Sequence, residues 1–382
     1  MNQSPYRVFL VLSCAALFTV ISCGDSSDPS SPDPATSAAF RDAGPWAVGV
    51  RTLQLPDRDV EIWYPVAPAD VEGLDKYEYF IRDALPQFVD DILAPDVNPP
   101  FETDAYRDVP ASGDGPFPLI LFAHGFASYR NQSTFLTAHL ASWGFVVAST
   151  DYFNRALATV LSGGGGDDEP TDTELSRSVV DLLKEENVRS GGPLEGRVSA
   201  ERIAIIGHSA GGGTARVFGD ESDVVTYVPL SAGSSSNPDF MIDFPDKASL
   251  WLTGTIDGIV EVERVEAAYE EAPAPKRLLL LDGGGHLAPS DICQIGEDGG
   301  GVIAIAIEAG LGDLLPESFR ALGTDGCQEE ALDILDGWPT IRHFVTAHMR
   351  WAFGIDSEPS WEGDQIAGDL PEATFTYRED VN

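Results

Sequence analysis

Residues 203–213 read IAIIGHSAGGG: four apolar residues, then Gly-His-Ser-Ala-Gly and two further glycines. The apolar run, with three β-branched residues, predicts a buried strand, and the small residues after it predict a sharp turn into a helix. Such a turn would hold Ser209 in a strained conformation, with Gly207 and Gly211 at positions where a Cβ atom would clash. The Ser209 hydroxyl would then lie clear of the strand at a helix N-terminus, where a nucleophile is expected. A glycine-rich turn with an incidental serine shares this pattern, so the rest of the chain must supply the other parts of a site.

The composition excludes one large class of partners. The chain has 382 residues, enough for one large α/β domain or two smaller ones. It carries 62 Asp and Glu against 23 Lys and Arg, a formal net charge of −39. A surface of this sign repels nucleic acid and anionic lipid head groups, so we expect no nucleic-acid partner.

The N-terminus has the pattern of an export signal. Arg7 is the only charged residue before the apolar run of residues 8–21, which is short for a membrane span. The run ends in Val-Ile-Ser followed by Cys23, which resembles a bacterial lipobox. We therefore expect residues 1–22 to be a lipoprotein-type signal peptide and Cys23 to carry acyl chains that anchor the protein to a membrane.

Gly24 after the lipobox cysteine favours the bacterial outer membrane, by resemblance to lipoproteins of Gram-negative bacteria. An ordinary signal peptide would instead leave the protein periplasmic or secreted. Residues 23–43 are rich in Ser, Pro and Asp, and we expect them to form a disordered tether.

The four cysteines fall into two groups. Cys14 lies in the expected signal and Cys23 at the expected lipid site, which leaves Cys293 and Cys327. In an oxidising compartment this remaining pair predicts a disulfide. Two thiols without a dense histidine cluster do not predict a metal site.

Eight apolar runs predict the strands of one mixed sheet, the first two antiparallel. The fifth run precedes Ser209, the seventh precedes Asp257, and the eighth precedes His286; the runs are residues 46–55, 60–64, 119–123, 145–149, 203–206, 224–230, 250–252 and 278–281. Helical spacing falls between them at 133–143 and 173–187, and after them at 343–353. The carboxyl ends of parallel strands meet at one edge of the sheet, so these three side chains are expected to lie together. Their chain order is that of the catalytic triad in the α/β-hydrolase fold.

This order assigns a role to each residue. Ser209 would be the nucleophile, His286 the base that takes its proton, and Asp257 the acid that orients His286. Two other acids compete for that last role: Asp282 is closer to His286 in sequence, and Asp151 also ends a strand, but before the nucleophile in the chain. We prefer Asp257 because it follows the strand from which this fold supplies its acid.

The oxyanion donors are expected on either side of the nucleophile. The strand 119–123 ends in His124-Gly125-Phe126, and a glycine there lets the next N–H turn into the crevice. The backbone N–H groups of Phe126 and Ala210 are therefore the predicted donors of an oxyanion hole. A simple turn at the end of a strand is the alternative.

Seven short segments carry a wider resemblance: GPWAVGVRT at 44–52, WYP at 63–65, FAHGF at 122–126, WGFVV at 143–147, GPLEGR at 192–197, GHSAGG at 207–212 and GH at 285–286. With them the chain resembles α/β hydrolases of the dienelactone-hydrolase-like branch, related to platelet-activating-factor acetylhydrolases and to cutinase-like polyester hydrolases. The resemblance covers most of residues 44–355 and implies ester hydrolysis without metal or organic cofactor. True dienelactone hydrolases use a cysteine nucleophile, so Ser209 argues against that particular activity.

The catalytic domain is thus expected to span residues 44–355 and an acidic tail residues 356–382. Residues 66–116 read as an insertion or long connection with one weak helical segment near 77–89. Residues 287–340 form a second insertion, either a lid stapled by its two cysteines or a segment packed on the domain edge.

The expected activity is that of a serine esterase or lipase working through an acyl-enzyme on small-molecule, lipid or polyester esters. Two alternatives stay open. The first is a non-catalytic envelope lipoprotein of the same fold, which would not need all three triad residues. The second is a serine peptidase of this fold, which the lack of a propeller or large cap domain in the sequence disfavours.

Overall fold

The computed structural model describes residues 38–166, 169–234, 243–357 and 363–381. Their centre is a ten-stranded mixed sheet of order β12-β11-β10-β9-β8-β6-β7-β2-β1-β5. The parallel strands are β6 (Phe117–Ala123), β7 (Val146–Thr150), β8 (Val198–His208), β9 (Val224–Leu230), β10 (Ala248–Gly254) and β11 (Lys276–Leu281). At one side β2 (Arg58–Val66) and β1 (Ala47–Leu55) continue the sheet antiparallel, and the short β5 (Tyr106–Arg107) pairs with β1.

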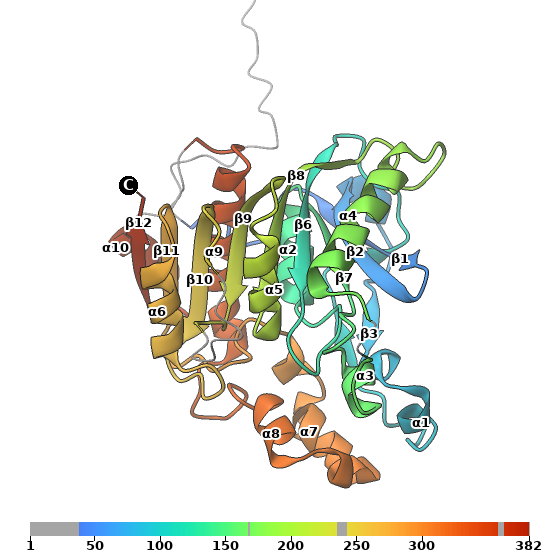
Figure 1. Cartoon of the computed structure of the whole chain (residues 1–382). Coiled ribbons are helices and arrows are strands. Elements are labelled where there is room, and N and C mark those ends of the chain that lie inside the picture. The colour runs from blue at the N-terminus through green and yellow to red at the C-terminus, as the bar shows by residue number, and fades with distance from the viewer. Residues whose placement is uncertain (1–37, 167–168, 235–242, 358–362, 382) are drawn as a thin grey trace, which may run out of the picture. The chain divides into compact units, whose positions relative to one another are not determined.

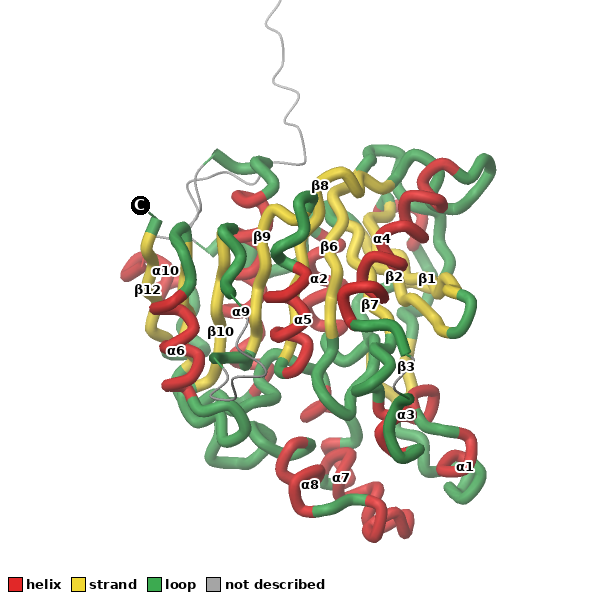
Figure 2. The backbone as a smooth tube through the Cα atoms, viewed as in Figure 1, coloured by secondary structure: helices red, strands yellow, loops and turns green. Residues whose placement is uncertain are grey.

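Helices cover both faces of this sheet (Figures 1 and 2). On one face lie α2 (Thr134–Ser142) and α9 (Ile334–Ala352); on the other lie α4 (Asp172–Val188), α5 (Ala210–Phe218) and α6 (Val262–Glu271). Each face has its own apolar core, because the central strands are buried on both sides and their side chains alternate between the two. The predicted fold class is confirmed, and the eight expected strands all form.

Two strands extend the sheet beyond the eight that were expected, β5 and β12 (Phe375–Asp380). The second lies in the segment predicted as an acidic tail, which also contains α10 (Gly363–Asp369). β12 pairs antiparallel with β11, and its Phe375 and Tyr377 rings lie 5.3 and 5.1 Å from the ring of Phe344 on α9. The two aromatics alternate as in a strand, but the acidic residues around them favoured the prediction of a tail over that of a strand.

The insertion at 66–116 does not contain the predicted helix over 77–89. It contains η1 (Pro68–Val71), β3 (Glu78–Phe80), η2 (Ile81–Ala84), the single turn α1 (Gln87–Asp90) and β4 (Pro100–Glu102), which pairs with β3. Pro86 accounts for the difference, because a proline and the residue before it interrupt a helix.

The expected tether ends earlier than residue 43, because residues 38–43 are packed against the domain. Phe40 is only 1% exposed and packs edge-on against Trp143, and the amide of Gly44 donates to the hydroxyl of Ser142. One buried aromatic thus fixes a segment whose composition suggests disorder. The expected signal, Cys23 and most of the tether lie in residues 1–37, outside the described residues. Within the described part of the chain, no helix has the length and apolar character needed to cross a membrane.

The second insertion forms a series of short helices closed by a disulfide between Cys293 and Cys327, the pair expected from the sequence. This insertion lies near the carboxyl edge of the sheet, in the same region as α1 and α3 (Leu157–Leu161) (Figure 1). Its helices are η4 (Ile292–Gln294), η5 (Glu297–Gly299), α7 (Gly301–Ala306), η6 (Ile307–Leu311), η7 (Gly312–Leu314) and α8 (Glu317–Leu322).

Candidate active site

Ser209 occupies the sharp turn between β8 and α5. Its backbone angles are φ 54° and ψ −120°, a conformation that costs a non-glycine residue about 1–3 kcal/mol. A Cβ atom on Gly207 would lie 1.9 Å from the carbonyl oxygen of Gly211, and one on Gly211 would lie 2.1 Å from that of Ala123. The two glycines therefore allow β8, α5 and the end of β6 to meet around the serine, as the sequence predicted.

Asp257 and His286 form a buried pair at the ends of β10 and β11. The Nδ1 atom of His286 lies 2.9 Å from Oδ2 and 3.1 Å from Oδ1 of Asp257. The carboxylate also accepts hydrogen bonds from the amides of Ile259 and Val260, at 2.9 and 2.8 Å. Burial opposes ionisation of Asp257, but the bonds from His286 and the two amides outweigh it and hold the pKa of Asp257 below its ordinary value. The acid is thus ionised at neutral pH and fixes which imidazole nitrogen faces it.

The other imidazole nitrogen of His286 is available for chemistry. Nε2 is buried and has no hydrogen-bond partner among the described residues. His286 and Ser209 line the same pocket. This is the arrangement of a base that receives a proton at Nε2 while an acid holds Nδ1.

The two rival acids lie elsewhere. Asp151 accepts hydrogen bonds from the backbone amide of Arg130 at 2.7 Å and from its guanidinium at 2.6 Å. Asp151 is thus engaged in an ion pair with Arg130 and not with His286. Asp282 is exposed to solvent. Among the described carboxylates, Asp257 is the one hydrogen-bonded to the His286 ring.

The two predicted oxyanion donors flank the nucleophile. Ala210 is the first residue of α5, so its N–H is one of the four that an α-helix leaves without an internal acceptor. On the other side, a Cβ atom on Gly125 would lie 3.4 Å from the Cβ atom of Ser209. Phe126 follows that glycine and lines the pocket, and its ring lies edge-on to Phe319 of α8 at 6.1 Å.

A hydrogen-bonded chain that the sequence did not predict joins the loop at Gly125 to the loop at His286. The Gly125 amide donates to Oε1 of Gln132 at 2.8 Å, and Nε2 of Gln132 lies 2.6 Å from Nδ1 of His208. Nε2 of His208 in turn lies 2.8 Å from the carbonyl oxygen of His286. Gln132 gives no sequence signal, because it lies in a loop and its contact with His208 joins residues that are far apart in the sequence.

Burial keeps the neighbouring histidines neutral. It lowers the pKa of His208 to about 3 and that of His124 to about 3. His124 accepts from the amide of Tyr152 at Nε2, as expected of a structural residue. Neither of these two histidines is therefore suited to accept a proton near neutral pH.

The pocket above Ser209 is lined mainly by apolar side chains, most of them aliphatic. Most of them come from three segments: 81–97 in the first insertion, α3, and the disulfide-closed insertion. The aromatic residues Tyr77, Tyr79, Phe80 and Phe88 of the first insertion do not line it. These three segments contribute the apolar residues Ile81, Leu85, Val89, Leu93, Val97, Leu157, Leu161, Val302, Ile303, Ile305, Ala306, Leu311, Leu314, Leu315, Phe319 and Leu322.

Known proteins with similar sequences carry the names of ester hydrolases. Residues 108–221 match the family model for chlorophyllase. Lipase 1 of Moraxella sp. (strain TA144) is 28% identical over 189 residues, which cover 47% of this chain and 51% of the relative. Cutinase est2 of Thermobifida alba is 27% identical over 177 residues, covering 45% and 53%. A bis(hydroxyethyl) terephthalate hydrolase of Streptomyces coelicolor is 32% identical over 122 residues, covering 32% and 34%. The chain thus spans about half the length of the first two relatives and a third of the last.

One solved structure shares the fold over nearly its whole length. A ferulic acid esterase from Streptomyces cinnamoneus superposes with a TM-score of 0.55 at 22% identity, covering 86% of this chain and 96% of the esterase. At this identity the likeness speaks for the fold alone. The strand order, the turn at Ser209 and these similarities together show that the chain has the α/β-hydrolase fold and is similar in sequence to lipases and cutinases.

Proposed function

We propose that this protein is a serine carboxylic-ester hydrolase in which Ser209 is the nucleophile, His286 the general base and Asp257 the orienting acid. One observation carries the proposal. Asp257 holds the Nδ1 atom of His286, while the Nε2 atom has no hydrogen-bond partner among the described residues. His286 lines the same pocket as Ser209. The names of the similar proteins are consistent with this chemistry.

The reaction proceeds in two halves. Ser209 Oγ attacks the ester carbonyl carbon while its proton passes to Nε2 of His286, and Asp257 stabilises the imidazolium that forms. The amides of Phe126 and Ala210 bind the negative oxygen of the tetrahedral intermediate. Its collapse breaks the ester C–O bond, and the imidazolium protonates the departing alcohol. Water then attacks the acyl-enzyme with the same proton relay and releases the carboxylic acid.

The pocket supports esters with an extended aliphatic acyl group as substrates. Its mainly aliphatic lining gives an acyl chain few hydrogen-bonding partners and a large apolar surface to pack against. Burying each methylene of such a chain is worth about 0.8 kcal/mol, so several buried methylenes would separate long-chain from short-chain esters clearly. Aromatic acyl groups, as in terephthalate or ferulate esters, are the alternative that the assay below also tests.

The test is hydrolysis of p-nitrophenyl esters of increasing acyl length by the wild type, Ser209→Ala and the matched control Ser178→Ala, an exposed serine on α4. We expect the wild type and Ser178→Ala to be active, with kcat/KM rising with acyl length, and Ser209→Ala to fall to background. Labelling of the wild type and Ser178→Ala, but not of Ser209→Ala, by a fluorophosphonate would identify the nucleophile independently of the substrate.

Equal rates in wild type and Ser209→Ala, or no hydrolysis by either, would overturn the proposal and favour a non-catalytic lipoprotein of this fold. Cleavage of peptide amides in preference to esters would favour the peptidase alternative. Higher activity on p-nitrophenyl benzoates than on long aliphatic esters would overturn the aliphatic substrate class while leaving the ester hydrolase in place.

We also propose that the enzyme is an exported lipoprotein of the bacterial outer membrane, anchored through Cys23. The lipobox-like sequence supports this, and the disulfide between Cys293 and Cys327 suits an oxidising compartment. Metabolic labelling with a palmitate analogue should mark the wild type and not Cys23→Ala. Label retained in the variant would exclude Cys23 as the lipid site.

A further inference from the structure

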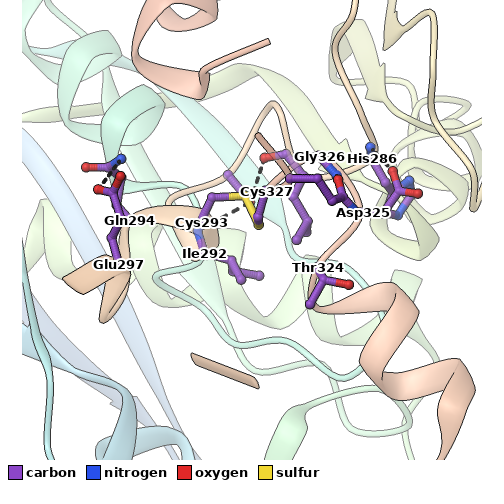
Figure 3. Close-up of a disulfide and its surroundings, with 12 residues drawn as sticks. His286, Ile292, Cys293, Gln294, Glu297, Thr324, Asp325, Gly326 and Cys327 are labelled. Carbon is purple, nitrogen blue, oxygen red and sulfur yellow. Dashed lines mark hydrogen bonds between the residues drawn. A yellow bond between two sulfur atoms is a disulfide. The ribbon is translucent and has the colours of Figure 1, made fainter. Parts of the chain in front are cut away.

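The carboxylate of Asp325 bridges the two loops that carry the acid and the base. Its Oδ1 accepts a hydrogen bond from the backbone amide of His286 at 2.6 Å, and its Oδ2 accepts from the backbone amide of Gly258 at 3.1 Å. Gly258 directly follows Asp257. Figure 3 shows Asp325 beside His286, on the segment that also carries Cys327. One side chain thus holds the residue after the acid and the base residue itself.

Backbone packing around this bridge is close. The Leu287 amide donates to the carbonyl oxygen of Asp325 at 2.9 Å. A Cβ atom on Gly285 would lie 2.4 Å from the Cα atom of Gly326, which has a φ of 97°. Two glycines therefore let the two chain segments touch, and this contact brings the carboxylate to the amides.

The segment that carries Asp325 also forms one wall of the pocket. The disulfide from Cys293 to Cys327, 34 residues apart in sequence, closes a loop that ends two residues after Asp325. Within that loop, Phe319 and Leu322 of α8 line the pocket. The same covalent loop therefore supplies both apolar lining and the carboxylate bridge.

We propose that Asp325 is a positioning residue that fixes the separation of Asp257 and His286. It reaches neither the imidazole ring nor Ser209 by a hydrogen bond, and acts through two backbone amides. Hydrogen bonds from amides to a carboxylate are charge-assisted and stronger than neutral ones. Without them the two loops lose their common anchor, and small displacements of catalytic groups lower rates steeply. The kinetic test of this inference rests on the proposed function, whereas the spectroscopic test is independent of it.

The kinetic test compares Asp325→Ala and Asp325→Asn with Asp313→Ala, an exposed aspartate of the same insertion. For Asp325→Ala we expect kcat to fall about 10- to 100-fold, with KM nearly unchanged and the same factor on acetate and long-chain esters. Asp325→Asn keeps one acceptor oxygen and should fall between Asp325→Ala and wild type. Asp313→Ala should match the wild type. A loss confined to long-chain esters and expressed in KM would mean that Asp325 supports only the pocket wall and would overturn the inference.

The spectroscopic test is the downfield proton resonance of His286 Nδ1–H, assigned as the signal missing in His286→Gln. In Asp325→Ala we expect it to shift or broaden, because the bond to Asp257 loosens, and in Asp313→Ala to stay in place. An unchanged resonance with unchanged kcat would overturn the positioning role even if Ser209→Ala is inactive. Conversely, a perturbed resonance would support it even if no esterase activity were found. Circular dichroism at the assay temperature verifies that each variant is folded.

Discussion

Nε2 of His208 lies 2.8 Å from the backbone carbonyl oxygen of His286, so the residue before the nucleophile supports the loop of the base. The partners of His208 define its tautomer. Oε1 of Gln132 accepts from the Gly125 amide, so Nε2 of Gln132 donates to Nδ1 of His208. His208 therefore carries its proton on Nε2 and donates it to His286. One carboxamide and one neutral imidazole thus couple the oxyanion loop, the nucleophile turn and the base.

Replacing Gln132 with Met tests this chain at nearly constant side-chain length. Gln132→Met leaves the Gly125 amide and Nδ1 of His208 buried without partners, which costs about 1–3 kcal/mol for each group. We expect the free energy of unfolding in urea to fall by about 2–4 kcal/mol. We also expect kcat to fall more in Gln132→Met than in Gln54→Met, a control at an exposed position, because the oxyanion loop loses its anchor. Kinetics identical to those of the control would show that the chain does not position the loop.

Asp257→Asn tests the choice among the three acids. The amide cannot stabilise the imidazolium, and it favours the wrong tautomer of His286, so kcat should fall by a factor on the order of 10⁴ with the fold intact. Asp282→Asn, which removes an exposed charge close in sequence to the base, should leave kcat within twofold of wild type. A large loss in Asp282→Asn and none in Asp257→Asn would reverse the assignment.

Buried neutral histidines predict that stability declines with acid. His124 and His208 have folded pKa values of about 3 against an ordinary value of 6.5, so between these pH values the unfolded chain binds more protons and the free energy of unfolding falls as pH falls. At pH 5 each of the two histidines should cost about 2 kcal/mol relative to neutral pH. The lowered pKa of Asp257 acts in the same direction, with its contribution lost below the ordinary value of 3.8. Urea unfolding between pH 8 and 5 measures the trend, and constant stability over this range would contradict it.

Asp291 opposes that trend. Its carboxylate lies at the N-terminus of α2 and accepts from the Thr134 hydroxyl and the Phe135 amide, but burial still raises the pKa of Asp291 to about 7. A raised pKa gives stability that is complete below 3.8 and is lost as pH rises through 7. Asp291→Asn removes this contribution, so the variant should lose more stability than the wild type between pH 7 and pH 5. Parallel pH profiles for the two proteins would argue against a neutral Asp291.

Filling the pocket should shorten the acyl chains it accepts. Ala306 lines the pocket on α7 and packs with the cluster of Val89, Leu93 and Leu311. Ala306→Phe should raise KM for long-chain esters while leaving kcat/KM for acetate esters within about twofold, because the catalytic groups do not move. Ala321→Phe, an exposed position on α8, is the matched control. Equal chain-length profiles in both variants would place the acyl chain elsewhere.

The sequence predicted the sheet and the position of its site more completely than the surroundings of that site. Buried parallel strands are continuous apolar runs, so their number and the polar residues that follow them can be recognised without tertiary information. The departures arise where one residue overrides composition: Pro86 interrupts the expected helix, Phe40 ends the tether early, and Tyr377 turns part of the acidic tail into a strand.

The sequence by itself determined the nucleophile turn at Ser209, because the backbone geometry of that turn admits only small residues at Gly207 and Gly211. It also determined the order in which candidate acid and base follow their strands. Only the tertiary structure decided what lies above and behind the serine. Gln132 contacts the side chain of His208 and Asp325 the backbone amide of His286, both far away in the sequence. An amide or a carboxylate in a loop belongs to no periodic pattern from which such a partner could be predicted. The pocket likewise arises from insertions whose apolar residues could equally have packed into a core, and only their placement around Ser209 distinguishes the two outcomes.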